Sequence, residues 1–398
     1  MVHYEEYDAI VIGGGPAGLI AAAELVKGDL SVLVLEEHSQ IGLPNHCAGL
    51  VSISGLKHIE ITPSPESIQN IVSGARLIAP NGRVLEVGGD EDKAYVLNRG
   101  LFDKSLAIKA IELGAEIMLS SRVTQAIRKK SGFLCKVSSG TTHLCKLLID
   151  SEGISCRILK SLGLSPPSSN WIFPAAQFEI SGLRFNPKTV ELYLGQRVAP
   201  GFFAWSIPTS EYSSKIGVAT KKGNPLEILE LFREKHFPAS QKFSIRMGNV
   251  VLGGPVAKTF DDNLIVVGDA AGQTKPTTGG GVVVGGLCAK IAGDVGRDAL
   301  LNGDLSAKNL SKYEKRWRNM LESELAKMQA LRRLFPRLSD DSLNKILDFT
   351  LKSNLRRIIE EKGDMDFQGD VISHIINQPG IYTLLLSLGG DVLSSIFK

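Results

Sequence analysis

Short apolar runs alternate with helix-spaced segments at two places in the chain. Residues 9–12 and 31–35 are mostly apolar runs typical of buried strands, and residues 16–27 between them have the spacing of a helix. The run 263–269 is again apolar and leads into a glycine-rich segment that opens a helix. Strand–helix units of this kind predict an α/β fold with a parallel sheet.

Other parts of the chain have different patterns. Residues 73–98 alternate apolar and polar positions around the turn Pro80-Asn81-Gly82, which predicts a hairpin. Residues 171–251 repeat short strand-like segments around one helix at 226–236, as expected for an antiparallel sheet over a ligand. From residue 306 helical spacing continues nearly to the end, so the expected fold is α+β overall.

The composition permits a large globular protein and excludes several other classes. The 398 residues are 43% hydrophobic, which allows a sizeable core and excludes a disordered or fibrous chain. A formal net charge of +3 is too small to favour nucleic-acid binding. The 41 glycines fall in clusters, which suggests backbone that approaches a ligand closely.

Cysteine usage indicates a reducing compartment, and the two terminal segments bear on the location of the protein. The five cysteines include no C-x-x-C pair and no histidine cluster at ligand spacing, so neither a disulfide framework nor a metal site is expected. The acidic start lacks the regions of a signal peptide, and we expect a cytoplasmic protein. The apolar segment 382–397 is too short for a membrane span and is expected to pack against the fold rather than lie on a bilayer.

A glycine motif connects the first predicted strand to the first helix. Gly13, Gly15 and Gly18 form G-x-G-x-x-G, and Glu36 ends the second strand. The first glycine permits a tight turn, the second lets the backbone approach a pyrophosphate, and the third lets helix and strand pack closely. Because the acid can accept ribose hydroxyls, FAD or NAD is expected here rather than NADP.

A second candidate for the same ligand lies near residue 270. Asp269 ends the apolar run, and three consecutive glycines at 279–281 precede the next helix. An acid beside exposed amides at a helix N-terminus suits a polyol and a flat ring. The alternative is an ordinary strand–turn–helix in which Asp269 only caps the helix.

The two segments together resemble the flavoprotein superfamily that includes para-hydroxybenzoate hydroxylase, in which they hold one FAD. Residues 45–49 (NHCAG), 200–208 (PGFFAWSIP) and 276–281 (PTTGGG) narrow this to a resemblance to the geranylgeranyl reductase family. Archaeal members of that family saturate the isoprenoid chains of ether phospholipids. The resemblance covers residues 7–320 and fits the last 80 residues only loosely.

The two α/β stretches on either side of the antiparallel segment predict a discontinuous Rossmann-like domain, which the resemblance identifies as FAD-binding. An antiparallel-sheet substrate domain is inserted in it, and a helical tail follows. The expected boundaries are 1–72, 95–165 and 253–300 for the FAD-binding domain, 73–94 and 166–252 for the substrate domain, and 301–398 for the helical region.

The motifs and the resemblance together imply a set of cofactor-binding residues. They are Gly13, Gly15, Pro16, Ala17, Gly18, Glu36, Glu37, Cys47, Ala48, Gly49, Arg99, Val123, Gly153, Gly268, Asp269, Gly280, Gly281 and Val282. Arg99 begins a predicted helix, where its guanidinium could hold the flavin pyrophosphate or ribityl oxygens. Without the resemblance it would be a solvated residue at a helix start.

Cys47 and His46 are the catalytic candidates, because the family has a cysteine that faces the flavin in this segment. The small residues Ala48 and Gly49 permit close approach to a ring. The alternative is that Cys47 is a small buried hydrophobe, as most single cysteines are.

The candidate substrate pocket consists of Phe202, Phe203, Trp205 and Pro276. Aromatic residues alternating on a strand usually pack in a core. In the family, however, the matching segment faces the substrate, and a polyprenyl chain needs an apolar slot.

The segment 150–157 departs from the pattern of the related hydroxylases, because Glu152 stands where they have aspartate. That segment contacts both FAD and NADPH in the hydroxylases, so the electron donor stays open between NADPH and reduced ferredoxin. Residues 308–337 carry nine basic and three acidic side chains. They could contact lipid headgroups or an acidic donor, although a solvated helix face is the simpler explanation.

The expected activity is an FAD-dependent reduction of isoprenoid double bonds, in which hydride reaches one alkene carbon and a proton the other. Cys47 or a neighbouring group is the expected proton donor. One alternative is a flavin monooxygenase or halogenase, which would have a compact polar pocket. Another is a non-enzymatic prenyl carrier, which would have no need of intact cofactor motifs.

Overall fold

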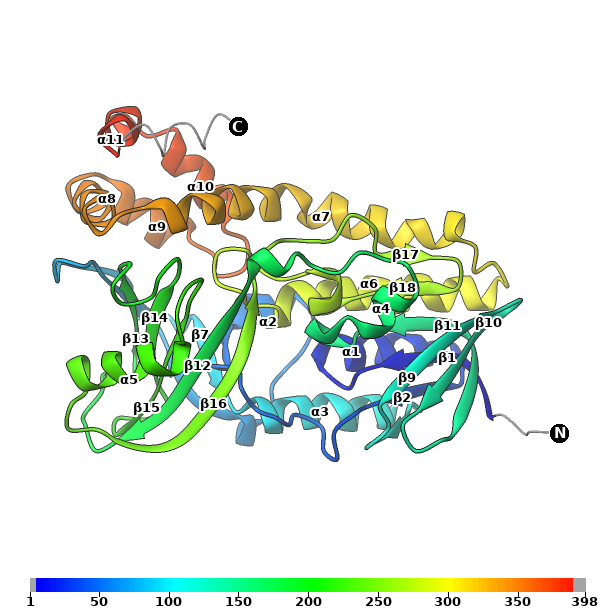
Figure 1. The fold of residues 1–398 in the computed structure, drawn as a ribbon. Coiled ribbons are helices and arrows are strands. Elements are labelled where there is room, and N and C mark those ends of the chain that lie inside the picture. The colour runs from blue at the N-terminus through cyan, green and yellow to red at the C-terminus, as the bar shows by residue number, and fades with distance from the viewer. Residues whose placement is uncertain (1–4, 389–398) are drawn as a thin grey trace.

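The computed structural model describes residues 5–388, which form three β-sheets and the helices around them (Figure 1). The sheets have eight, seven and three strands. The first sheet and the second lie at opposite ends of the molecule, and the long helix α7 (Ala307–Leu334) extends along both (Figure 1).

The eight-stranded sheet has a parallel core in the order β18-β11-β1-β2-β8. Its strands are β1 (Glu5–Ile12), β2 (Val32–Leu35), β8 (Glu116–Met118), β9 (Val123–Lys129), β10 (Gly132–Val137), β11 (Thr142–Asp150), β17 (Phe260–Asp261) and β18 (Leu264–Val266). Because both faces are covered, the strands are apolar and buried where they cross the core, as in residues 9–12, 32–35, 147–149 and 264–266. The carboxyl ends of β1, β2, β11 and β18 share one edge.

Helices and a hairpin cover the two faces of this sheet. The helices α1 (Pro16–Leu25), α3 (Arg99–Glu112), α6 (Val282–Leu301) and α7 pack on one face. The hairpin β9–β10 and the short helix α4 (Arg157–Ser161) cover the other. The helix expected at 16–27 ends as an α-helix at Leu25 and continues to Gly28 as a 3-10 turn.

The seven-stranded sheet has the order β16-β12-β15-β14-β13-β5-β6. Its strands are β5 (Gly74–Ile78), β6 (Val84–Gly88), β12 (Ile172–Ser181), β13 (Thr189–Leu194), β14 (Phe203–Pro208), β15 (Ser213–Ala219) and β16 (Gln241–Val251). Neighbours are antiparallel except β13 and β5, which are parallel. Helix α5 (Pro225–His236) packs on one face, and the opposite face carries Phe203 and Trp205.

The small third sheet consists of β3 (Leu50–Ser52), β7 (Ala94–Leu97) and β4 (Ile68–Val72). Helix α2 (Ile53–His58) directly follows β3 in the chain. The sheet shares an apolar cluster with strands of the seven-stranded sheet, through Val96 on one side and Ile207 on the other. Its residues Val51 and Leu97 belong to the apolar cluster of the first sheet, so the small sheet contacts both larger sheets.

The C-terminal part is helical, as expected. After α7 come α8 (Asp340–Lys352), α9 (Leu355–Lys362), α10 (Gly369–Ile376) and α11 (Ile381–Ser387), which gather beyond the end of α7 near the seven-stranded sheet (Figure 1). The segment 382–397 lies largely outside the described residues. Between residues 5 and 388, no helix combines the length and apolar character needed to cross a bilayer.

The basic segment 308–337 is α7 with a short continuation. Its apolar stripe, which includes Tyr313 and Trp317, is fully buried against the first sheet. Several of its arginines have acidic partners, such as Arg316 with Asp294 and Arg318 with Glu314. Much of the positive charge of this segment therefore lies on a helix face that is partly neutralised by ion pairs within the protein.

Candidate active site

The two glycine-rich turns meet at the carboxyl edge of the parallel strands. Gly13 follows β1 with a φ of +98°, and Gly268 follows β18 with a φ of +68°. A Cβ added to Gly268 would lie 2.9 Å from the Cβ of Ala17 in α1. The turns are thus in direct contact, although about 250 residues separate them in sequence.

The glycines of the first motif have different surroundings, which match their expected roles. A Cβ on Gly13 would lie 2.5 Å from the carbonyl oxygen of Ser151, and one on Gly18 would lie 2.1 Å from that of Gly13. A Cβ on Gly15 would meet no atom within 4 Å. Gly15, just ahead of Pro16 at the start of α1, is therefore the position of the motif beside which the space is open.

Glu36 lies beneath this turn and is 7% exposed. Its Oε2 accepts a hydrogen bond from the Gly14 amide at 2.6 Å, and its Oε1 accepts one from the His38 amide at 2.8 Å. The His38 ring contacts Oε1 at 2.6 Å. A carboxylate offers about four lone-pair sites, so one remains for a ribose hydroxyl.

The neighbours of Glu36 have less direct roles. Glu37 forms ion pairs with Arg122 at 2.8 Å and with Arg157 at 3.4 Å. The Val123 side chain is buried in the core on the hairpin side of the sheet. Any contact of Val123 with a ligand would therefore come from its backbone.

Asp269 lies opposite the first motif, and its side chain reaches solvent although protein atoms surround it. None of the residues from 5 to 388 donates a hydrogen bond to its carboxylate, and a Cβ on Gly281 would lie 2.9 Å from its Oδ1. Desolvation raises the pKa of Asp269, and the charge of Arg99 opposes this shift. Helix α6 begins after Gly281 without a side-chain cap, so the alternative role of Asp269 as its cap is not observed.

Arg99 opens α3 and forms a bidentate ion pair with Asp103, at 2.8 and 2.9 Å. Burial alone would lower the pKa of Arg99, but Asp103 and the nearby Cys47 raise it above its usual value. The side chain is 14% exposed and lies near both Cys47 and Asp269. Its fixed position follows from the i,i+4 pairing within one helix.

The loop that contains Cys47 lies between the first sheet and the second. Cys47 is half-buried, and its Sγ accepts a hydrogen bond from the Gly49 amide at 3.4 Å. His46 is exposed, and a Cβ on Gly248 of β16 would lie 3.2 Å from its ring. Desolvation lowers the pKa of His46, and the charge of Arg99 lowers it further.

Trp205 and Phe203 lie on the face of the seven-stranded sheet opposite α5, and both are partly exposed. The Trp205 ring covers Gly217, where a Cβ would lie 2.3 Å from the ring atom Cζ2. Its Nε1 donates to the Oε1 of Gln177 at 3.3 Å. Trp205 also belongs to an apolar cluster with Ala48, the residue after Cys47.

Two of the expected pocket residues, Phe202 and Pro276, are buried in this structure. Phe202 is 2% exposed, and its ring stacks on Phe203 with centroids 4.1 Å apart. It precedes β14 and packs against Arg332 and Phe173, within the apolar cluster that also contains Phe203 and Trp205. Phe203 and Trp205 are partly exposed, and a substrate role for any of the four residues stays a prediction.

The altered acid at position 152 has a local structural role. Glu152 accepts hydrogen bonds from the amides of Arg157 at 2.8 Å and Leu159 at 2.9 Å, and from the Ser155 hydroxyl at 2.8 Å. It therefore caps the first turn of α4. Gly153, three residues after Asp150, has a φ of +67° in the same turn.

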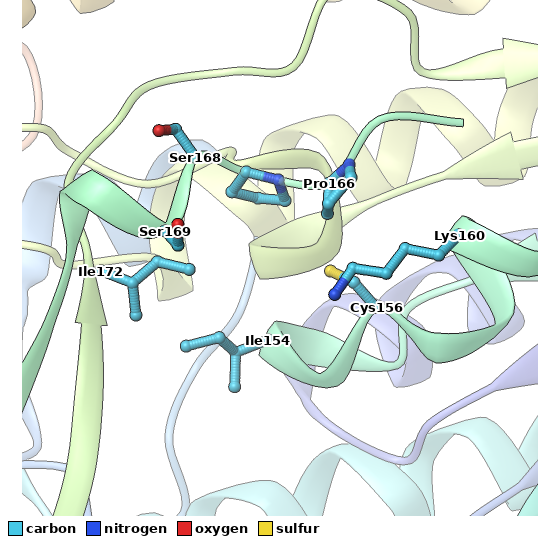
Figure 2. Close-up of a pocket in the computed structure, with 8 residues that line it drawn as sticks. Ile154, Cys156, Lys160, Pro166, Ser168, Ser169 and Ile172 are labelled. Atoms are coloured by element: carbon cyan, nitrogen blue, oxygen red, sulfur yellow. The ribbon is translucent and has the colours of Figure 1, made fainter. Parts of the chain in front are cut away.

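A pocket of about 320 Å³ opens beside this turn (Figure 2). It is lined by Ile154, Cys156, Lys160, Pro166, Pro167, Ser168, Ser169 and Ile172. Burial and the nearby acids Glu152 and Asp150 raise the pKa of Cys156 to about 12. Cys156 is therefore an unreactive thiol.

Sequence reasoning missed two buried lysines near the site. Lys215 of β15 donates hydrogen bonds to the Cys47 loop, and Lys275 pairs with Asp366 from the C-terminal region. A lysine within the apolar strand at 213–219 is a signal that could have identified Lys215. Asp366 has no such signal, because its partner is 91 residues away.

The fold and the meeting of the two turns define a Rossmann-like dinucleotide-binding protein. In agreement, residues 11–46 match the family model described as NAD(P)-binding Rossmann-like domain. The part of the chain from 5 to 388 has no group of three or more His, Cys, Asp or Glu residues placed to hold a metal ion.

Comparison with curated proteins identifies the family. The chain is 33% identical to digeranylgeranylglycerophospholipid reductase 2 of Methanothermobacter thermautotrophicus, over 86% of this chain and 91% of that protein. It is 34% identical to digeranylgeranylglycerophospholipid reductase 1 of Methanococcoides burtonii, over 86% and 87%. The chain belongs to the digeranylgeranylglycerophospholipid reductase family.

Solved structures agree with this assignment. A geranylgeranyl bacteriochlorophyll reductase-like protein from Thermoplasma acidophilum superposes with a TM-score of 0.87 at 26% identity, covering 97% of this chain and 100% of the other. A flavin-dependent brominase has a TM-score of 0.70 at 18% identity over 95% and 99%. The brominase shares the fold alone.

Proposed function

We propose that this protein is an FAD-dependent reductase that saturates the carbon–carbon double bonds of geranylgeranyl chains on archaeal-type ether phospholipids. The observation that carries the proposal is the similarity to digeranylgeranylglycerophospholipid reductases over most of both chains. The cradle between the two glycine turns supports it, because the open position at Gly15 lies at the same edge of the sheet as Asp269, whose carboxylate accepts no hydrogen bond from residues 5–388.

The residues of the cradle fit FAD. The amides around Gly15 at the start of α1 would hold the pyrophosphate, and Glu36 would accept the ribose hydroxyls. Asp269 and the uncapped start of α6 after Gly281 would hold the ribityl chain and one edge of the ring. Arg99 adds a fixed positive charge to the same cleft.

Bound FAD, once reduced, supplies the hydride for one carbon of the double bond. The chain must supply the proton for the other carbon, because an isolated alkene is poorly electrophilic. Cys47 is the residue we propose for this role, since it is half-buried beside Arg99 and next to the apolar cluster of Trp205. Phe203 and Trp205 would exclude water and orient the isoprenoid chain.

Replacement of Cys47 tests its role directly. Cys47→Ala should slow turnover by roughly a hundredfold or more, because general acid catalysis contributes on that order. FAD binding should change much less. An unchanged turnover would remove Cys47 from the mechanism.

The proposed activity is tested by anaerobic incubation of the flavin-loaded protein with dithionite and an unsaturated archaeal ether phospholipid. Mass spectrometry should show a gain of about two mass units for each double bond, the mass of the two hydrogens that reduction adds. Gains of about sixteen units under air, the mass of one oxygen atom, would instead indicate the monooxygenase alternative. An unaltered lipid under both conditions would reject both activities.

The electron donor and the site of action belong to the same proposal. NADPH and reduced ferredoxin, each in place of dithionite, should be compared as donors in this assay. Because the substrate is a membrane lipid, we propose that the protein acts at the cytoplasmic face of the membrane as a peripheral protein. Co-sedimentation with vesicles of archaeal lipid tests this, and full recovery in the supernatant would contradict it.

A further inference from the structure

Lys215 is a buried lysine that joins three separate segments of the chain. It lies in β15, its residue is 3% exposed, and its neighbours Ser214 and Ile216 are also buried. Its Nζ donates hydrogen bonds to the Gln69 side-chain oxygen at 2.7 Å, the Ala48 carbonyl at 3.1 Å and the Leu97 carbonyl at 3.2 Å. The three donors of the ammonium group thus have three acceptors.

All three acceptors are neutral, so the charge is buried without direct contact to a carboxylate. Desolvation lowers the pKa of Lys215, and the nearby charge of Arg99 lowers it further. Electrostatic interactions with Cys47 and Glu179 oppose this shift. A buried, unpaired ammonium costs stability that an apolar side chain would not cost. Its presence at this position therefore calls for a role beyond packing.

Two of the acceptors belong to the segments that carry the candidate catalytic groups. Ala48 directly follows Cys47, and Leu97 ends β7 two residues before Arg99. These segments already contact each other through the Leu97 amide, which donates to the Gly49 carbonyl at 2.8 Å. Lys215 reaches both from the seven-stranded sheet, the sheet that also carries Trp205.

We propose that Lys215 is a positioning residue that fixes the Cys47 loop and the start of α3 against the seven-stranded sheet. It sets the place of Cys47 and Arg99 relative to Trp205 and does not itself react. The kinetic part of this inference depends on the proposed function, whereas the structural part does not. A displacement of about 1 Å of a catalytic group can cost roughly a hundredfold in rate.

Hydrogen–deuterium exchange of the flavin-free protein tests the structural part. In Lys215→Met, peptides that cover residues 45–52 and 94–101 should exchange roughly tenfold faster or more, because both segments lose their hydrogen bond to the second sheet. Peptides outside these two segments, β4 (which carries Gln69) and β15 should exchange as in the wild type. Lys242→Met is the matched control. Lys242 lies in β16 of the same sheet, and its partly exposed side chain pairs with Glu230.

Steady-state kinetics of the flavin-loaded protein test the second part. Lys215→Met should lower kcat by roughly tenfold or more while KM and the FAD content stay within about twofold. Lys215→Arg keeps the charge and the donors and should recover part of both losses. If the Met variant does not fold, Lys215→Gln, which keeps an amide donor, is measured in its place.

The outcomes separate the two proposals. Faster exchange throughout the protein, or unchanged exchange in both peptides, would overturn the positioning role. A kcat equal to that of the wild type would do so as well. If the wild-type protein reduces no lipid, the proposed function fails, while the exchange experiment still decides the role of Lys215.

Discussion

Lys275 and Asp366 form a buried ion pair between the loop before α6 and the C-terminal region. Nζ and Oδ1 are 2.7 Å apart, and the two side chains are 9% and 3% exposed. Lys275 also donates to the Met365 carbonyl at 2.8 Å, and the Ser52 hydroxyl donates to Asp366. The helical region is thus attached directly to the loop that leads into Gly280 and Gly281.

Neutralising one partner of this pair should be costly. Asp366→Asn leaves the Lys275 ammonium buried without its counter-ion, which typically costs about 3 kcal/mol or more. We expect a corresponding loss in the free energy of unfolding, measured by denaturant titration. Glu360→Gln, which removes an exposed ion pair with Arg356, should cost less than about 1 kcal/mol. Equal losses in the two variants would contradict this prediction.

Gly15 and Gly18 should respond differently to the same added methyl group. Gly15→Ala places its Cβ in open space, so the apo protein should melt like the wild type while its affinity for FAD falls roughly tenfold or more. Gly18→Ala places its Cβ 2.1 Å from the Gly13 carbonyl and should lower the melting temperature. Flavin fluorescence titration and thermal melts measure both effects. Tight FAD binding by Gly15→Ala would place the cofactor elsewhere.

Gly217 should control the position of the Trp205 ring. A methyl group at Gly217 would overlap the ring, at 2.3 Å, and must displace it. We therefore expect Gly217→Ala to lower kcat/KM for the lipid by roughly tenfold, with FAD content unchanged. Gly89→Ala is the control, because a Cβ there meets no atom within 4 Å. A wild-type kcat/KM in Gly217→Ala would show that Trp205 does not contact the substrate.

Asp150 should make the stability of the apo protein fall as the pH rises. Burial, together with the charge of Glu152, raises the pKa of Asp150 well above its usual value, and its Oδ2 has no hydrogen-bond partner among residues 5–388. A carboxyl group whose pKa is higher in the folded state binds its proton more tightly there. Its stabilising contribution is complete below the unfolded pKa of about 3.9 and is lost as the pH rises through the folded value.

Asp150→Asn removes this dependence. The variant should lose less free energy of unfolding than the wild type between about pH 4 and pH 8, since an amide carries no charge to bury. Denaturant titrations at several pH values measure the two slopes. Asp269, whose pKa is also raised, is present in both proteins and contributes equally to each. Parallel slopes would show that Asp150 does not titrate in this range.

Much of the fold follows from local patterns in the sequence. The apolar run at 9–12 and the glycines at 13, 15 and 18 identify β1 and the start of α1, because tight turns and buried strands restrict which residues can stand at each position. The hairpin β5–β6 and helix α6 follow in the same way. The nature of the cofactor turn, including the open position at Gly15, was therefore determined by the sequence itself.

The tertiary structure decided which distant residues meet. Lys215 reaches Ala48 and Leu97 across 167 and 118 positions, and no local spacing encodes such contacts. Phe202 and Phe203 are adjacent and chemically identical, yet Phe202 is buried against Phe173 and Arg332 whereas Phe203 is partly exposed. Burial and hydrogen bonding between segments depend on how the sheets pack, and that packing is fixed only when the whole chain has folded.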